Sequence, residues 1–320
     1  MTNLTSPLAT DLNAFLAFKR SLGYRYERED FAIRSFDRFL SLYCRRRRTW
    51  DLGQSILAWM ASKPGRKPIT TSWYIGVFRQ FYKFLRRQPG RARIREPNWP
   101  QLPTTSDFIP HVFSVEDIKS LLHLANQLER PRFRRHLYRA LLLLLYCTGM
   151  RFGEPLRLRI QDVDIDSGLL FVAESKGRSR WVPFSRSLAR ELEQYMVERR
   201  SFAPARPQDY FFVGTDRPTL RVKTASETIR RLFRRAGLKP SSGRVGPRPY
   251  DLRATFAVHR LTRWYRQGVD LHTRLPWLSA YMGHDGILGT EKYLNATPEL
   301  LALTGDRFRR RVFGKPRGTR

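Results

Sequence analysis

The stretch ALLLLLYCTGMRFGE (residues 140–154) decides the fold of the second half of this chain. Its apolar run, Ala140 to Cys147, is much shorter than the roughly 20 residues of a membrane span, so it predicts a buried core helix. Thr148 and Gly149 break that helix, and Arg151 follows the break. Because an unpaired charge beside a buried segment is costly, we expect Glu154, three residues later, to hold the Arg151 guanidinium in place.

Patterns of secondary structure continue outward from this stretch. They predict helices at 115–127, 131–147, 186–200, 225–236 and 252–267, followed by shorter helical pieces, and strands at 169–174 and 180–184 that form a hairpin. Pro155 is acceptable in a first helical turn, so a further helix is expected to begin near Phe152. Ser114 followed by Val-Glu-Asp is a helix-start signature, with Asp117 in the position of a capping box.

The first hundred residues carry helical periodicity alone. Apolar residues recur at helical spacing within 32–43 and 73–85, and more weakly within 12–22 and 52–60. Four short helices of this kind predict a small bundle. The whole chain is therefore expected to be mainly α with a small antiparallel β-sheet, an α+β fold.

Prolines then interrupt the periodicity, at positions 89, 97, 100, 103 and 110. Proline restricts its own backbone and that of the preceding residue, so this segment predicts a semi-extended linker. We expect three parts: a helical bundle at 1–88, a proline-rich linker at 89–110, and a second domain with a C-terminal tail at 111–320.

The charge balance of the chain points to a polyanionic partner. Lysine and arginine number 60 against 28 acidic residues, a net charge of +32 with a pI near 11.2. Such an excess opposes compaction unless a polyanion neutralises it. The apolar fraction of 41% and the 7 Trp, 13 Tyr and 21 Phe exclude a disordered basic tail and favour a folded nucleic-acid binder. A basic ribosomal-type protein is the alternative, although such proteins are usually shorter and poorer in tryptophan.

Cysteine, histidine and terminal patterns narrow the class further. Two distant cysteines, Cys44 and Cys147, make no disulfide framework and suit a reducing cytosol. The N-terminus lacks the charged and apolar regions of a secretory signal, so we expect a cytoplasmic protein. The six histidines show no metal-ligand spacing, and no phosphate loop occurs, so the sequence predicts no metal site and no cofactor.

Five residues supply what cleavage of a phosphodiester without a metal requires: Arg151, Lys176, Arg253, His284 and Tyr293. Two arginine forks can hold the phosphate, each lowering the barrier by about 3 kcal/mol. A lysine at a hairpin tip can protonate the departing oxygen, and the tyrosine hydroxyl can attack with the imidazole nearby. Only about one tyrosine hydroxyl in a thousand is ionised at neutral pH, so the attack needs positive charge or a base.

Each of these residues alone is more often structural. An arginine picked blindly is one of many basic residues here, a lone histidine usually supports packing, and a helix tyrosine is usually half-buried. Clusters such as Arg45 to Arg48 are as often a solvated helix face as a phosphate contact. The set of five residues in this order is what indicates the chemistry.

Four segments resemble the boxes of the phage-integrase family of tyrosine recombinases: TGMRFGE (148–154), SKGR (175–178), DLRATFA (251–257) and MGH (282–284), the last followed nine residues later by tyrosine. The resemblance covers nearly the whole chain. It implies the two catalytic arginines at positions 151 and 253, with Glu154 as acidic partner of the first. It also implies a general acid at Lys176 toward the 5′ oxygen, a phosphate-bonding His284 and a nucleophilic Tyr293.

One position departs from the family pattern. The second box usually begins with histidine, as His-x-x-Arg, and often carries another histidine after the arginine, where this chain has Tyr250 and Ala254. A phenol donates a hydrogen bond to a phosphate but is a poor proton acceptor near pH 7. We count Tyr250 among the catalytic candidates and expect proton transfer from Tyr293 to be slower, or to use His284 or water. Alternatively, related recombinases do part of the work.

The resemblance implies a site-specific DNA recombinase or integrase that cuts and rejoins strands through a 3′-phosphotyrosyl link at Tyr293, without metal or ATP. Residues 275–301 resemble recombinases carried by transposons, which suggests a mobile element. The N-terminal bundle and linker resemble the family's core-binding domain, which with the catalytic domain clamps DNA. An accessory DNA-binding subunit with little catalysis, and a type IB topoisomerase, are the alternatives.

The same resemblance implies the partners. They are double-stranded DNA and a tetramer of this or related recombinases, in which residues after Tyr293 dock on a neighbour. We expect no membrane partner and a place near the nucleoid. Candidate DNA contacts in the N-terminal bundle are Arg45, Arg46, Arg47, Arg48, Arg79, Arg86 and Arg87.

Overall fold

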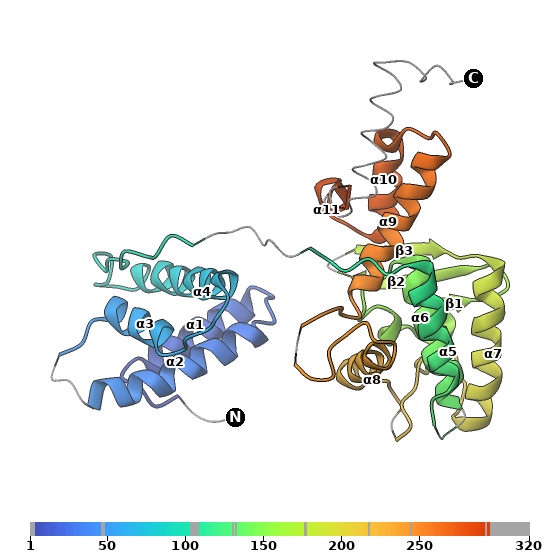
Figure 1. The fold of residues 1–320 in the computed structure, drawn as a ribbon. Helices are drawn as coiled ribbons and strands as arrows, with labels where there is room; N and C mark the ends of the chain where they lie inside the picture. The colour runs from blue at the N-terminus through green and yellow to red at the C-terminus, as the bar shows by residue number, and fades with distance from the viewer. Residues whose placement is uncertain are drawn as a thin grey trace, which may run out of the picture. The chain divides into compact units, whose positions relative to one another are not determined.

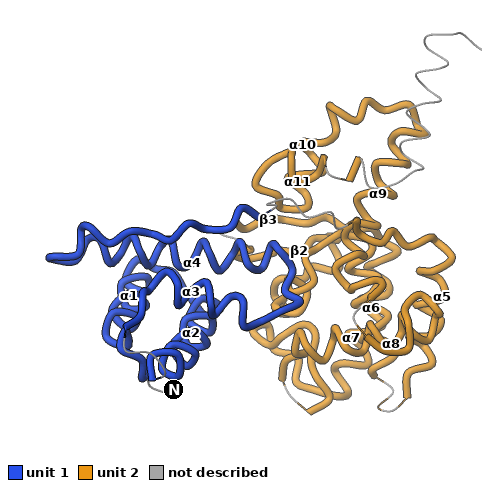
Figure 2. Tube along the Cα trace, turned by 60° about the vertical axis from the view of Figure 1, so that its left-hand side comes forward, with its two compact units in different colours: residues 1–108 blue, residues 109–320 orange. Residues whose placement is uncertain are grey.

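A computed structural model describes residues 4–45, 49–102, 109–129, 131, 133–175, 178–216, 218–243, 245–291 and 293–294. The chain divides into two compact units, Met1–Phe108 and Ile109–Arg320 (Figure 2). Each unit has a hydrophobic core of its own. Among the residues described, none of the helices combines the length and the apolar character that crossing a bilayer requires.

The first unit is a bundle of four helices, as its periodicity predicts (Figure 1). They are α1 (Ala9–Ser21), α2 (Glu27–Arg45), α3 (Leu52–Ala61) and α4 (Pro68–Arg86). Each helix contributes a large ring to the core, namely Phe15, Phe36, Trp59 and Phe78, and all four side chains are fully buried. Phe78 meets Phe36 edge-on at 4.9 Å and Trp59 at 5.6 Å between ring centroids, a geometry that aromatic pairs prefer.

Two short segments are fastened to this bundle. Before α1, the carboxylate of the buried Asp37 accepts the backbone N–H groups of Thr5 at 2.9 Å and Ser6 at 3.0 Å. After α4, the side chains of Ile94, Trp99 and Leu102 pack against the core of the bundle. The described part of the proline-rich segment therefore lies along the first unit as far as residue 102.

The second unit combines helices with one small sheet. Its described elements are α5 (Val115–Asn126), α6 (Phe133–Thr148), the 3-10 turns Pro155–Arg157 and Ile160–Asp162, β1 (Val163–Asp164), β2 (Leu169–Ser175), β3 (Arg178–Pro183), α7 (Arg186–Phe202), α8 (Val222–Arg235), α9 (Asp251–Arg266), α10 (Leu271–Met282) and α11 (Leu288–Glu291). The strands are antiparallel in the order β1-β2-β3. The expected mainly α fold with a small antiparallel sheet is confirmed.

Helix α6 is the centre of the second core. Five leucines of its apolar run, residues 141–145, lie in or against the buried cluster, and the helix packs against α5, α7 and α9 (Figure 1). The predicted capping box precedes α5: Ser114 Oγ accepts the Asp117 N–H at 3.0 Å, and Asp117 accepts the Ser114 N–H at 2.8 Å. Helix α6 ends at Thr148 and is followed by Gly149, whose φ of +60° suits glycine.

The structure differs from the sequence expectation at three places. No α-helix begins near Phe152; Pro155 instead opens a three-residue 3-10 turn, because Leu158 (ψ 137°) already returns to an extended backbone. The two-residue strand β1 was too short to predict. Residues 271–282 form one helix despite the internal Pro276, because Asp270 caps its start and its apolar face is buried.

The anchoring of the N-terminal segment yields a prediction. Asp37→Ala leaves the two N–H groups of residues 5 and 6 without their charged acceptor, which we expect to lower the free energy of unfolding of the first unit by about 2 kcal/mol. Glu27→Ala, at an exposed position in the first turn of α2, should change it by less than about 0.5 kcal/mol. Hydrogen exchange of α1 and α2 amides under increasing denaturant measures both values, and equal values would contradict the anchoring role.

Candidate active site

The last turn of α10 gathers three arginines. We call Tyr281, Met282 and Gly283 the α10 terminus. The Tyr281 carbonyl accepts Arg180 Nε at 2.9 Å and the Met282 carbonyl accepts Arg253 Nη2 at 2.8 Å. The Gly283 carbonyl accepts Arg151 Nη2. The last carbonyls of a helix have no partner within the helix and carry partial negative charge, so they suit cationic donors.

Arg253 is buried in the first turn of α9. It is the third residue of α9 and only 1% exposed. Besides its bond to Met282, its Nη1 donates to the Gly149 carbonyl at 2.6 Å. Burial lowers the pKa of the guanidinium, and the neighbouring Tyr293 and Tyr250 oppose that effect. The fork of Arg253 is therefore fixed from two sides, by the end of α6 and by the end of α10.

Glu154 holds Arg151, as the sequence suggests, and two further groups. Its buried carboxylate accepts Arg151 Nη1 at 3.0 Å and the Arg151 N–H at 2.8 Å. It also accepts both terminal nitrogens of Arg180, at 3.1 and 2.8 Å, and the Ser175 hydroxyl. Burial alone would raise the pKa of Glu154, but hydrogen bonds from Arg180 and Ser175 and the charge of Arg180 lower it to about 2. The carboxylate is thus ionised at neutral pH.

Tyr293 lies inside this group of charges. The ring is 1% exposed and packs in a small core with Met282 and residues of α9. Burial raises the pKa of its hydroxyl, while the charge and hydrogen bonding of Arg253, and the charge of Arg151, act in the opposite direction. The hydroxyl and the two arginines predicted to hold a phosphate are therefore brought together.

His284 adjoins both the tyrosine and the α10 terminus. Its ring centroid lies 6.2 Å from that of Tyr293. Its Nδ1 is 2.7 Å from the Thr290 hydroxyl, which fixes the orientation of the imidazole. His284 directly follows Gly283, whose carbonyl accepts the hydrogen bond from Arg151. The same turn of the backbone therefore positions both the Arg151 guanidinium and the His284 imidazole.

Tyr250 stands at the rim of the site. It precedes α9 and is 41% exposed, yet its phenol influences the pKa values of Arg253 and Tyr293. The loop before α9 is fastened by the buried Asp251, whose carboxylate accepts the N–H of Arg248 at 2.9 Å and its Nη2 at 2.9 Å. Tyr250 is therefore close to the other candidates and open to solvent.

The structure describes only some of the remaining candidate residues. Lys176 lies outside the described residues, as do Arg46, Arg47 and Arg48; the flanking Ser175 and Arg178 are paired across the hairpin. In the first unit, Arg45 and Arg87 are exposed. Arg79 and Arg86 are exposed too, and both face Glu96, at 3.9 and 3.7 Å. Ion pairs of this length at an exposed surface contribute little, so these two arginines remain available to another anion.

Two members of the site, Ser175 and Arg180, were missed by sequence reasoning. The alternation of side chains along the strands could have identified Arg180. This residue shares a face of β3 with the buried Val182 and lies opposite the buried Val172 of β2. An arginine at an inward position requires a partner. That alternation could have pointed to Glu154 as the partner.

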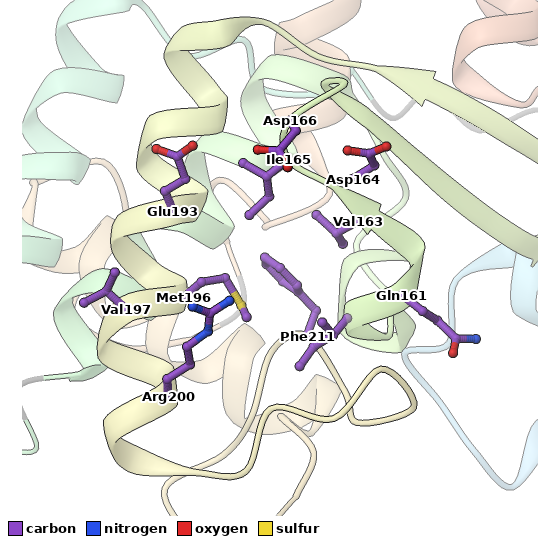
Figure 3. A pocket seen from close by; sticks show the side chains of 11 residues that line it. Gln161, Val163, Asp164, Ile165, Asp166, Glu193, Met196, Val197, Arg200 and Phe211 are labelled. Atoms are coloured by element: carbon purple, nitrogen blue, oxygen red, sulfur yellow. The ribbon is translucent and has the colours of Figure 1, made fainter.

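A separate cavity of about 560 Å³ lies between α7 and residues 160–166 (Figure 3). Asp164, Asp166 and Glu193 line it together with apolar side chains, and Arg200 is its basic residue. Carboxylates repel a phosphate backbone, and Arg151, Arg253, His284 and Tyr293 do not line this cavity. The candidate site for a polyanion is therefore the group around the α10 terminus.

Comparison with known proteins gives a consistent picture. The model of the phage integrase family matches residues 111–299. The protein y4rB of Sinorhizobium fredii (strain NBRC 101917 / NGR234), which its name marks as a candidate integrase/recombinase, is 31% identical over 93% of this chain and 95% of its own length.

Two solved structures share the fold. XerH site-specific recombinase bound to palindromic difH substrate in a post-cleavage complex has a TM-score of 0.64 at 17% identity, over 87% of this chain and 80% of that one. A lambda integrase tetramer bound to a Holliday junction has a TM-score of 0.53 at 16% identity, over 88% and 76%. At such identities the likeness concerns the fold alone.

The pKa of Glu154 gives a pH-dependent prediction. A pKa lowered from 4.5 to about 2 in the folded state corresponds to about 3 kcal/mol of stability, present above pH 4.5 and lost as the pH falls toward 2. Glu154→Gln should therefore destabilise the second unit by about that amount at pH 7. Denaturant titrations of both proteins from about pH 7 to about pH 3 measure the difference, which should shrink on the acid side. A difference that is independent of pH would refute this role.

Gly149 gives a steric prediction. A Cβ at this position would lie 2.3 Å from Cδ1 of Phe256, so Gly149→Ala combines strain at φ +60° with a clash and should destabilise by about 3 kcal/mol or more. Gly237→Ala is the matched control, because Gly237 has φ +72° but no atom within 4 Å. It should lose only about 1 kcal/mol in the same denaturation experiment. Equal losses would show that contact with Phe256 is unimportant.

Proposed function

Because this chain belongs to the phage integrase family of tyrosine recombinases, which are site-specific DNA recombinases, we propose that it cuts and rejoins DNA through a covalent link between Tyr293 and a 3′ phosphate. One observation carries the proposal: Tyr293 is buried in one cluster with Met282, whose carbonyl binds Arg253, and the adjoining Gly283 carbonyl binds Arg151. A nucleophile and two permanent cations around one point suit an anionic reaction centre.

The two arginines hold the scissile phosphate. A guanidinium has five N–H donors, and the carbonyls of residues 149, 282 and 283 engage only some of those on Arg253 and Arg151. The hydrogen bonds to these carbonyls fix the two guanidinium groups before DNA binds, so little reorganisation is needed when the phosphate binds. His284 lies beside the same point and donates to a phosphate oxygen.

The strand exchange conserves bonds in each step. The Tyr293 oxygen attacks phosphorus, the bond to the 5′ oxygen breaks, and Lys176 protonates that leaving oxygen. The phenolic proton passes to water while His284 donates to the phosphate; it passes to His284 only when that imidazole nitrogen accepts and does not donate. A 5′ hydroxyl of a partner strand then attacks the phosphotyrosine, which restores the tyrosine and forms a new phosphodiester. The energy of the broken bond is kept in the intermediate, so the reaction proceeds without ATP.

Access to the nucleophile is a requirement of this proposal. Tyr293 is 1% exposed, and burial raises the pKa of its hydroxyl above the ordinary value of a tyrosine. The residue follows α11, a helix of four residues whose Leu288 is 81% exposed. We expect this short segment to shift when DNA binds, which brings phosphate and hydroxyl into contact.

A second candidate function is favoured by one residue. Tyr250 stands where the family usually has histidine, and it is 41% exposed at the rim of the site. Because a phenol is a poor base near pH 7, the chain could serve as a DNA-binding subunit that supports related, active recombinases. Formation of a covalent adduct distinguishes the two functions.

The proposed function also implies the binding partners of the chain. Double-stranded DNA is the expected partner of both units, with the first unit as core-binding domain and its exposed arginines as candidate contacts to the phosphate backbone. By analogy with the lambda integrase tetramer on a Holliday junction, we expect four copies, or copies of related recombinases, on two DNA sites. We further propose a mobile element as source and the nucleoid in the cytoplasm as place of action.

The test is a suicide substrate. A duplex selected for binding from random DNA, nicked so that the cleaved end diffuses away, should give an adduct that survives denaturant. Tyr293→Phe should reduce adduct formation by at least about a thousandfold, whereas Tyr210→Phe, at a half-buried position outside the site, should leave it unchanged.

Other outcomes of this experiment decide between the rivals. Tight binding without an adduct would overturn the proposed catalysis and favour the accessory subunit. In a separate assay, relaxation of plasmids of arbitrary sequence would favour a topoisomerase. An adduct that persists in Tyr293→Phe would exclude this residue as the nucleophile.

A further inference from the structure

Arg180 is the third arginine at the α10 terminus, and its contacts differ from those of the other two. Its Nε donates to the Tyr281 carbonyl at 2.9 Å, and its Nη1 and Nη2 donate to Glu154 at 3.1 and 2.8 Å. All three nitrogens thus have acceptors within the protein. Its side chain is 11% exposed. Arg180 is therefore built into the wall of the site and does not serve as a free phosphate ligand.

These contacts join segments that are distant in sequence. Arg180 is the third residue of β3 and contacts Glu154, which in turn holds Arg151. The carbonyl that Arg180 binds precedes the one that binds Arg253. A shift of the Arg180 guanidinium would therefore change the positions of Arg151 and Arg253 relative to each other and relative to β3.

Gly283 indicates how tightly this fork is fitted. A Cβ on Gly283 would lie 2.8 Å from Arg180 Nη1 and 2.9 Å from its Cζ. The residue also has φ +70°, which favours glycine. The α10 terminus thus lies against the plane of the guanidinium, and no side chain at position 283 fits between them.

We propose that Arg180 is a positioning residue for strand cleavage: by linking β3, Glu154 and the α10 terminus, it sets the geometry in which Arg151 and Arg253 hold the phosphate. This inference rests on the proposed function. Arg180 acts through these two arginines and does not touch the reacting atoms. Its planar fork makes three bonds in two directions, which a lysine ammonium at the same position cannot reproduce.

The first test separates cleavage from binding. Arg180→Gln should lower the single-turnover rate of adduct formation by about 10- to 100-fold while DNA affinity changes by less than about threefold. Arg180→Lys should fall between Arg180→Gln and the unaltered protein, because it keeps the charge and loses the fork.

The chain offers a matched control for the loss of an arginine–glutamate pair. Arg139 of α6 donates its Nε and Nη2 to Glu191 of α7, at 2.7 and 2.6 Å, and both side chains are partly buried. Arg139→Gln removes the same kind of pair outside the site. It should destabilise the fold and leave the cleavage rate of the folded, DNA-bound protein unchanged.

The pH dependence of the cleavage rate distinguishes a positioning role of Arg180 from a merely structural one. The groups that face Glu154 are Arg180, Ser175, Arg151 and, through its charge, Arg253. Without Arg180 the pKa of Glu154 rises, and its carboxylate is protonated at a higher pH. The cleavage rate of Arg180→Gln should therefore decline at a higher pH than that of the unaltered protein when measured from about pH 8 to about pH 4. A double variant that also carries Glu154→Gln should lack this additional decline.

The outcomes are distinguishable from failure of the proposed function. If the unaltered protein forms the adduct and Arg180→Gln forms it equally fast with the same pH profile, the positioning role is overturned. If the unaltered protein forms no adduct, the proposed catalysis fails, and hydrogen exchange tests the link on its own. Faster exchange in peptides 178–183 and 279–286 of Arg180→Gln, and not of Arg139→Gln, supports the link. Unchanged exchange contradicts it.

Discussion

The arrangement of the second unit depends on one buried carboxylate. Glu154 is surrounded by donors from three segments: Arg151 in the turn after α6, Ser175 at the end of β2 and Arg180 on β3. Burying a carboxylate is unfavourable by itself, and two cations with well-aligned hydrogen bonds reverse that effect. The ionised form is consequently favoured so strongly that its pKa falls to about 2. In a chain with a net charge of +32, this single anion allows two guanidiniums to lie close together.

The α10 terminus complements the carboxylate. Three consecutive carbonyls, from residues 281 to 283, bind arginines that come from β3, α9 and the turn after α6. Peptide carbonyls carry no net charge, so they orient a guanidinium without neutralising it. Arg253, which the carbonyls of Gly149 and Met282 bind, therefore keeps its positive charge toward the point where Tyr293 lies. Arg151 is also paired with the Glu154 carboxylate at 3.0 Å, which offsets part of its charge. The backbone carbonyls orient the arginines, and the buried Glu154 carboxylate holds two of them at a fixed separation. Together these contacts form a site suited to a phosphate.

Sequence reasoning predicted the helices of both units and the hairpin, because apolar residues recur there at helical or strand spacing. It also selected Arg151, Glu154, Arg253, His284 and Tyr293, which the structure brings together. It missed Arg180, since the motif reading treated the second strand only as support for a hairpin tip. It could not predict the carbonyl contacts of residues 281 to 283, because backbone groups look alike in every sequence and only the tertiary fold brings the arginines to them. The internal Pro276 likewise obscured α10, whose buried face outweighs one missing hydrogen bond.

In the proposed mechanism, the oxygen of Tyr293 and the guanidinium groups of Arg151 and Arg253 converge on one phosphorus atom. A structure of the protein with a nicked duplex and orthovanadate, which adopts the five-coordinate geometry of a phosphoryl group under attack, measures this directly. We expect a vanadium bonded to the Tyr293 oxygen, with nitrogens of both arginines within hydrogen-bonding distance of its equatorial oxygens. Vanadium bound elsewhere, or a Tyr293 ring that stays packed away from the DNA, would contradict it.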